Sequence, residues 1–374
     1  LAIPMTIAQM VQVLYNIVDR IYIGHLQGSS SLALTGLGLT FPIVTIVAAF
    51  TNLFGMGGAP LCSIARGKND MERAEVIMGN TFILLIISSF ILMLSSYIFM
   101  KPLLYIFGAS DITYPYAAEY LKIYLLGTPF IMLGTGMNGF INSQGFGKIG
   151  MMTILLGAII NIILDPIFIF YLKMGVRGAA WATIISQYVS GIWAIYYFTS
   201  KFSGMKLYVK NLKLNFEKIK SIASLGSAPF AIQMGASIVN YTYNSTLKIY
   251  GGDAGIGAMA IVQAVITFIS MPIFGINQGL QPILGYNYGA RLYPRVKEAL
   301  FKAIFAATVL CVIDFLAIQF LSKYFINIFT QEKELVRIAS VGLKIQTFML
   351  PIVGFQIIAS IYFQAIGKPK MSFF

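Results

Sequence analysis

Hydrophobic residues in this chain occur in long, nearly uninterrupted runs that are separated by short polar segments. A helix needs about 20 apolar residues to cross the hydrocarbon core of a bilayer. Segments of that length predict ten membrane-spanning helices, at residues 1–25, 32–65, 77–105, 113–142, 151–172, 177–199, 219–250, 255–288, 298–328 and 334–365. Prolines interrupt several of them, so we expect tilted or kinked helices whose freed backbone groups are satisfied by neighbouring helices.

The composition supports an integral membrane protein. The chain is 58% hydrophobic and only 10% charged, whereas soluble domains carry about 25% charged residues. So little charge cannot cover a soluble surface, which excludes a soluble enzyme, a nucleic-acid-binding protein and a disordered chain. The single histidine and two cysteines in apolar runs offer neither a multi-histidine metal site nor a disulfide framework. We expect a monomer in the lipid bilayer, with no nucleic-acid partner and no cofactor.

Basic residues are distributed unevenly among the loops between the predicted helices. The even-numbered loops hold sixteen Lys and Arg and the odd-numbered loops hold six. Because basic residues favour cytoplasmic loops, the N-terminus and the even loops are predicted to be cytoplasmic in a multi-pass plasma-membrane protein. The most basic loop, 201–218, is predicted to be a cytoplasmic linker, so a cysteine at Ser203 should resist impermeant thiol reagents in intact cells.

The second half of the chain repeats the first at an offset of 222 residues. Glycine, proline and basic positions coincide, as in Gly57 with Gly279, Pro60 with Pro282, Gly67 with Gly289, Arg73 with Arg295 and Lys148 with Lys370. Repeats with an even number of helices share one orientation and are related by an axis along the membrane normal. We predict a six-helix lobe at 1–200, a linker at 201–218, and a lobe at 219–374 in which only helices seven to ten are present. Helices eleven and twelve of a complete protein would be absent.

Acidic residues within the predicted helices are the main candidates for function, because charge inside a bilayer is costly. Asn161 and Asp165 are four residues apart and therefore share a helix face. Pro166 follows and disturbs the local backbone hydrogen bonding. A carboxylate and an amide on one face can hold a proton or a small cation, and the alternative is a kinked helix with a polar patch.

Spacing from the loops places further polar groups at the depth of Asp165. Thr183 and Asp165 each lie nine residues from the centre of the loop near residue 174, and Asp19 lies about eight residues from the centre of another outer loop. We therefore expect these groups at similar depth in the outer half of the membrane. Asp314 has no polar neighbour at helical spacing and is expected to be structural.

Amide and tyrosine side chains distinguish the second half, which has no acid at the position matching Asp19. Together they predict a polar substrate cavity, and singly they favour interhelical hydrogen bonds; the candidates are Tyr241, Asn244, Gln263, Gln278, Gln281 and Gln356. The sequence has no H-E-x-x-H, G-x-S-x-G or Walker motif. Catalysis is therefore not expected, and an ion gradient is the simplest source of energy for transport.

Three motifs in combination resemble the multidrug and toxic compound extrusion (MATE) transporters of the bacterial DinF-like and MepA-like branch. They are YNIVDRIYIG at 15–24, NIILDP at 161–166 and AAWAT at 179–183, together with the repeated glycine-proline pattern at 57–67 and 279–289. The resemblance implies twelve helices in two lobes around a central cavity. It also implies alternating-access export of cationic amphipathic drugs from the bacterial cytoplasm, in antiport with H⁺ or Na⁺.

The resemblance also implies site residues. The cation or proton site of this branch corresponds to Asp19, Asn161, Asp165 and Thr183, with Na⁺ held by the last three, and Pro166 is the expected hinge. One alternative is a lipid-linked oligosaccharide flippase of the related superfamily, but its anionic substrate would favour basic residues at the cavity centre. The basic residues here lie in loops and at helix ends. A second alternative is an integral-membrane transferase, which the absent catalytic motifs disfavour.

Overall fold

The computed structural model describes residues 1–24, 30–329 and 332–372, and it leaves several side chains within 16–35 and 240–257 undescribed. Over the described residues the fold is entirely helical. The elements are α1 (Ala2–Gly24), α2 (Ser30–Gly67), α3 (Met71–Ile98), α4 (Met100–Ile106), α5 (Tyr114–Ser143), α6 (Gly147–Pro166), η1 (Ile167–Tyr171), α7 (Val176–Thr199), η2 (Val209–Leu212), α8 (Phe216–Gly289), α9 (Tyr293–Asn327), α10 (Lys333–Gln346), α11 (Leu350–Ala365) and α12 (Pro369–Ser372).

Each of the ten predicted segments falls mainly on helix, and two of them, 77–105 and 334–365, are each divided between two α-helices. The first is split at Phe99 into α3 and α4. The segments 219–250 and 255–288 both lie in α8 and correspond to its two apolar spans, Phe216–Val239 and Ala258–Gly289. The segment 334–365 is divided into α10 and α11, which meet at an angle of 50°. Hydrophobic runs indicate which residues form apolar helix, whereas breaks such as that between α10 and α11 depend on the local backbone geometry.

Six helices of the described chain are long and apolar enough to cross a membrane, or seven if α10 and α11 form one bent span. The sequence predicts ten spans, three more than these seven. The difference is α1, α5 and α7, which are helical at the expected residues but are not counted among these spans. Two of these helices pack closely on each other, since Gly127 of α5 lies against Ile184 of α7, and Gly191 of α7 lies against Phe130 of α5. Such surfaces serve helix–helix contact rather than lipid contact.

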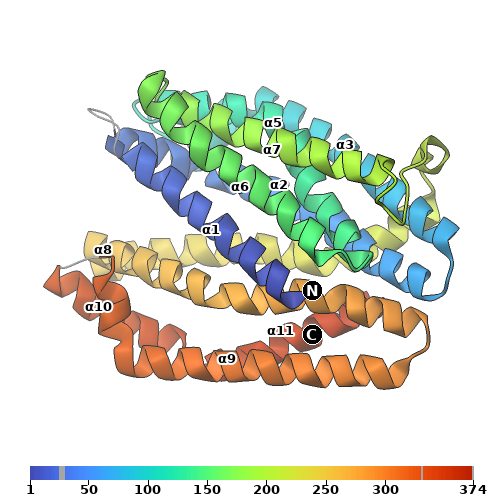
Figure 1. Ribbon diagram of the computed structural model, residues 1–374. Helices are drawn as coiled ribbons and strands as arrows, with labels where there is room; N and C mark the ends of the chain where they lie inside the picture. The colour runs from blue at the N-terminus through green and yellow to red at the C-terminus, as the bar shows by residue number, and fades with distance from the viewer. Residues whose placement is uncertain (25–29, 330–331, 373–374) are drawn as a thin grey trace.

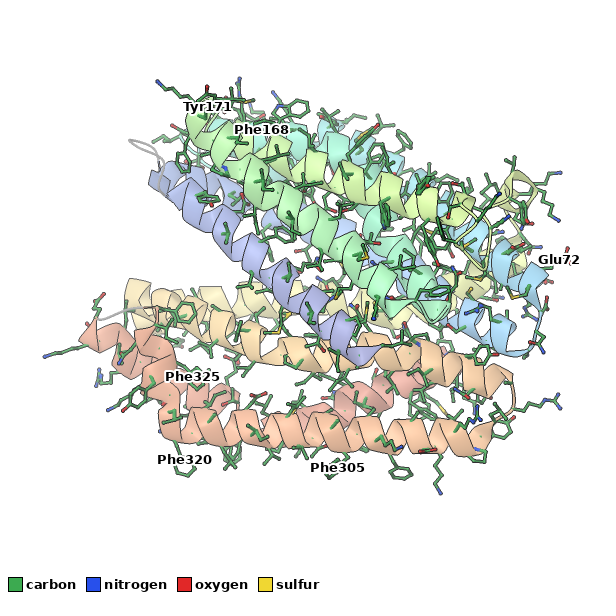
Figure 2. All side chains as sticks on the ribbon, in the orientation of Figure 1. Glu72, Phe168, Tyr171, Phe305, Phe320 and Phe325 are labelled. Carbon is green, nitrogen blue, oxygen red and sulfur yellow. The ribbon has the colours of Figure 1, made fainter. Side chains whose placement is uncertain are left out.

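The helices gather into two groups, with α1 to α7 in one and α8 to α11 in the other (Figure 1). α2 and α1 both contact α8 and so join the groups. In the same view, the groups lie close together at one end of the molecule and further apart at the other. Large aromatic side chains such as Tyr171, Phe305 and Phe320 point outward (Figure 2), and each is more than 70% exposed. An apolar outer surface of this kind is suited to lipid.

Two glycine contacts between the groups are reciprocal. Gly67 of α2 lies against the carbonyl oxygen of Tyr286 in α8, and Gly289 of α8 lies against the carbonyl oxygen of Ile64 in α2. Each member of the first contact is 222 residues from its counterpart in the second, as a pseudo-two-fold relation between the halves requires. A Cβ at either glycine would overlap the opposing backbone. The matched glycines of the repeat therefore serve the close approach of α2 and α8.

A third glycine allows a test of this packing. A Cβ on Gly226 of α8 would overlap the carbonyl group of Leu53 in α2, whereas Gly235 of the same helix has open space at that position. We expect Gly226→Ala to lower the free energy of unfolding by about 1–3 kcal/mol through overpacking. Gly235→Ala should be neutral or slightly stabilising, because alanine favours helix. Thermal unfolding of both variants in detergent measures the difference, and equal melting temperatures would contradict the assigned contact.

Candidate functional site

A buried carboxylate and amide occupy the last turns of α6. Asn161 Nδ2 donates a hydrogen bond to Asp165 Oδ1 over 3.3 Å, so the two side chains share a face as their spacing predicts. Asn161 is 1% exposed and Asp165 is 0% exposed. Their remaining oxygens, Asn161 Oδ1 and Asp165 Oδ2, are buried and have no hydrogen-bond partner among the described residues. Two oxygens thus remain as acceptors at one buried point.

Three further helices bring polar groups to this point. Asp19 of α1, which packs along α6, lies close enough to Asp165 for the two charges to interact. Tyr120 of α5 also lies within electrostatic reach of Asp19, and its side chain is hydrogen-bonded to that of Thr183 on α7. Tyr124, one turn further along α5, stacks on Tyr120 with ring centroids 6.0 Å apart. The structure therefore brings the four residues expected from the sequence into one cluster.

Tyr120 and Tyr124 are members of this cluster that the sequence analysis did not identify. Both are 6% exposed, and they extend the cluster from the carboxylates to Thr183. A search for intramembrane acids cannot find them, because tyrosine is common in membrane helices. Their spacing of four residues on a glycine-rich helix is the one sequence signal that could have drawn attention to them.

Pro166 marks a change in helical geometry next to Asp165. α6 ends at Pro166, and the chain continues into the π-helical turn η1. Proline removes a backbone donor, and π-helical turns are common at functional sites, where they widen the helix and redirect side chains. Asp165 thus lies on a regular helix, two residues before the π-helical turn begins at Ile167.

The arrangement suits reversible binding of a proton or a small hard cation. Two buried carboxyl groups close together oppose double ionisation, since each loses its hydration and repels the other. A proton on one of them, or a cation between oxygens, would relieve that repulsion. Asp165 and Asn161 supply carboxylate and amide oxygens, which are the ligand types that hard cations prefer. Thr183 connects to them through Tyr120 and Asp19.

The remaining candidates lie elsewhere. Asp314 is half-buried on α9, in the other group of helices. Gln281 donates a hydrogen bond to Gln364 over 3.4 Å, and Gln364 in turn donates to the backbone of Met56. Gln263 and Gln278 are half-buried in α8, and Gln356 is exposed on α11. The side chains of Tyr241 and Asn244 lie outside the described residues. Two cavities, one between α2, α3 and α8 and one between α9 and α10, are lined by other residues than these amides.

The reciprocal helical halves, the lipid-facing surface and the buried acid cluster define a multi-pass membrane transporter rather than an enzyme. A sequence model of the MatE family matches residues 4–167 and 229–374. The chain belongs to this family.

Individual relatives agree with the family model. The chain is similar to the multidrug export protein MepA of Staphylococcus haemolyticus, with 28% identity over 99% of this chain and 81% of the relative. MepA of Staphylococcus aureus (strain MSSA476) is 27% identical over the same shares. Among solved structures, the MATE multidrug transporter DinF-BH superposes with a TM-score of 0.92 at 33% identity, covering 100% of this chain and 83% of that one.

The Tyr120–Thr183 pair can be tested by a double-mutant cycle. Thr183→Val preserves shape but leaves the buried hydroxyl of Tyr120 without this partner. We expect a loss of about 1–3 kcal/mol in the free energy of unfolding. The double variant Tyr120→Phe/Thr183→Val should recover most of that loss, because an apolar pair has no hydrogen bond to satisfy. Additive losses in thermal unfolding would show that the two side chains act independently.

Proposed function

We propose that the chain exports cationic, amphipathic compounds across the bacterial plasma membrane in exchange for H⁺ or Na⁺. Membership of the MatE family, together with the names of the MepA and DinF-BH relatives, supports multidrug efflux. The single observation that carries the coupling is the Asn161–Asp165 pair, buried beside Asp19 with two oxygens lacking hydrogen-bond partners among the described residues. A coupling ion needs a buried acceptor whose charge changes when the ion binds, and this pair provides one.

The proposed cycle is alternating access between two halves, at 1–200 and 219–374, joined by the 201–218 linker. The contacts of Gly67 and Gly289 close the halves at the end that the loop charges assign to the cytoplasm. Ion binding relieves the repulsion between Asp19 and Asp165, and α1 and α6 repack. Pro166 and η1 are the proposed bending point of that change. The protein works as a monomer with its N-terminus in the cytoplasm.

Replacing the central acid tests the proposal directly. We expect Asp165→Asn to abolish gradient-driven efflux while the protein still folds and binds drug, because an amide can neither take up a proton nor neutralise a cation. Asp314→Asn removes an acid from an apolar helix of the other group and is the matched control, with efflux close to wild type. The measurement is efflux of a fluorescent cation in everted vesicles under separately imposed pH and sodium gradients.

The two gradients also identify the ion, since only the coupled gradient should drive transport by the wild-type protein. An Asp165→Asn variant that pumps at the wild-type rate with an unchanged pH profile would exclude this acid as the coupling site. Loss of transport in the Asp314 variant alone would assign coupling to the other group of helices.

The orientation has its own test. Ser203, the position suggested by the sequence, is unsuitable because it is 6% exposed and hydrogen-bonds to Gln144. Lys201 lies in the same linker and is exposed. In a background without the native cysteines, Lys201→Cys should resist impermeant thiol reagents in intact cells and react in everted vesicles. Labelling in intact cells would place the linker outside.

A further inference from the structure

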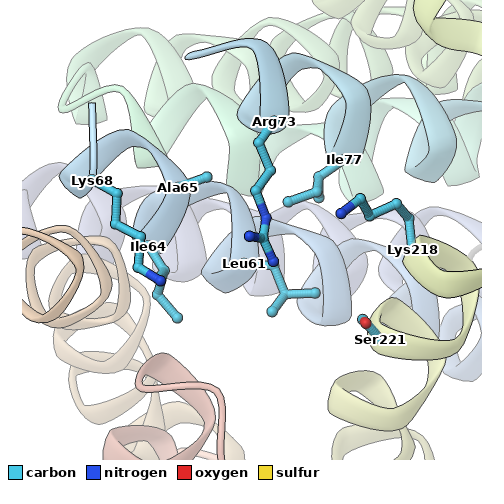
Figure 3. Close-up of a pocket in the computed structure, with 8 residues that line it drawn as sticks. All are labelled: Leu61, Ile64, Ala65, Lys68, Arg73, Ile77, Lys218 and Ser221. Atoms are coloured by element: carbon cyan, nitrogen blue, oxygen red, sulfur yellow. The ribbon is translucent and has the colours of Figure 1, made fainter. Parts of the chain in front are cut away.

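A small cavity lies between the end of α2, the start of α3 and the start of α8 (Figure 3). Its volume is about 60 Å³, which is room for a few water molecules or one tetrahedral oxyanion. Its lining residues are Leu61, Ile64, Ala65, Lys68, Arg73, Ile77, Lys218 and Ser221. The cavity joins the two halves, because α2 and α3 belong to the first and α8 to the second.

Three cationic side chains line this cavity, and no carboxylate does. Figure 3 shows Arg73 extending into it from α3, Lys218 from α8 and Lys68 from the end of α2. Both ion pairs found among the described residues involve other side chains. Two nearby acids have other roles, since Asp70 accepts from the backbone N–H of Arg73 and Glu75 accepts from that of Lys206. The positive charge of the cavity is therefore not neutralised by its own lining.

Helix dipoles add to this positive potential. Arg73 and Lys218 each lie in the third position of their helix, after the N-terminal caps Asp70 and Asn215. The N-terminus of a helix carries partial positive charge, which favours anions and disfavours basic side chains there. The first turns also hold the exposed acids Glu72 and Glu217. These two acids do not line the cavity, whereas Arg73 and Lys218 both do.

The surrounding packing holds these cations together. Asn80 of α3 is 0% exposed; its side-chain oxygen accepts from the Asn215 backbone N–H over 2.8 Å, and its amide donates to the Lys213 carbonyl over 3.2 Å. On the other side, Gly57 of α2 lies against the carbonyl oxygen of Ile222 in α8. The start of α8 is thereby attached to both α3 and α2, which fixes the backbone positions of Lys218 and Arg73 relative to each other.

We propose that this cavity binds a phosphate group and that the bound phosphate connects the two halves. Phosphate accepts several charge-assisted hydrogen bonds, and arginine and lysine are its usual partners. The source is either the headgroup of an anionic phospholipid or free inorganic phosphate. Leu61, Ile64 and Ile77 line the same cavity, and basic pockets between membrane helices are known to bind lipid headgroups. Because the ligand contacts both halves in this arrangement, it stabilises the closed contact of α2 and α8.

Binding is tested with three forms of the protein: the wild type, the double variant Arg73→Gln/Lys218→Gln, and the control Lys201→Gln/Lys213→Gln. The control removes the same charge from exposed linker positions outside the cavity. Each is reconstituted into phosphatidylcholine nanodiscs, with or without phosphatidylglycerol, and separately with inorganic phosphate at matched ionic strength. We expect the added phosphate group to raise the melting temperature of the wild type and the control, and its affinity for the double variant to fall about 30-fold.

The outcomes separate the sources. Stabilisation by phosphatidylglycerol but not by inorganic phosphate identifies a lipid headgroup, and stabilisation by inorganic phosphate identifies the free anion. Equal stabilisation of the double variant and the control, or none in the wild type, would overturn the proposal. If the double variant does not fold, Lys68→Gln is compared with Lys213→Gln, and equal affinities would overturn it as well. These measurements use no transport, so they are independent of the proposed efflux.

Discussion

The close approach of α2 and α8 is the constraint on which the rest of the structure depends. Backbone-to-backbone contact without side chains between helices is available only where glycine removes the Cβ. Gly67 and Gly289 provide this contact on opposite helices at one end of the molecule, while Gly57 and Gly226 provide it for the first part of α8. These contacts place the basic cavity at the junction of the halves. At the opposite end of the molecule, the two groups of helices lie further apart (Figure 1).

The acid cluster lies in the first group of helices, outside these glycine contacts. Its members come from α1, α5, α6 and α7, and Asp165 precedes a proline and a π-helical turn. α1 contributes Asp19 to the cluster and also contacts α8, where Gly275 lies against Thr6. If a change in charge at Asp165 moves α1, the contact between α1 and α8 must change as well. One helix connects the proposed ion site to the interface between the halves.

The acid cluster at Asp165 and the basic cavity at Arg73 favour ligands of opposite charge. Around Asp165, buried oxygens without hydrogen-bond partners in the described part of the chain favour a proton or cation, and the low dielectric strengthens that preference. Around Arg73, cations at two helix N-termini favour an anion. The first site lies within one half, where ion binding can change helix packing. The second spans both halves, where an anion holds one arrangement in place.

The sequence by itself determined the helical class, the positions of the apolar segments, the repeat and the Asn161–Asp165 pair, because hydropathy, offset matches and the helical period are local or one-dimensional properties. It could not determine that Tyr120 joins the cluster, that Ser203 is buried within a basic linker, or that Lys218 meets Arg73. The bend between α10 and α11 was likewise outside its reach. These features depend on which faces of distant helices meet. Only the tertiary packing decided this, because glycines at chosen positions let particular helices approach closely.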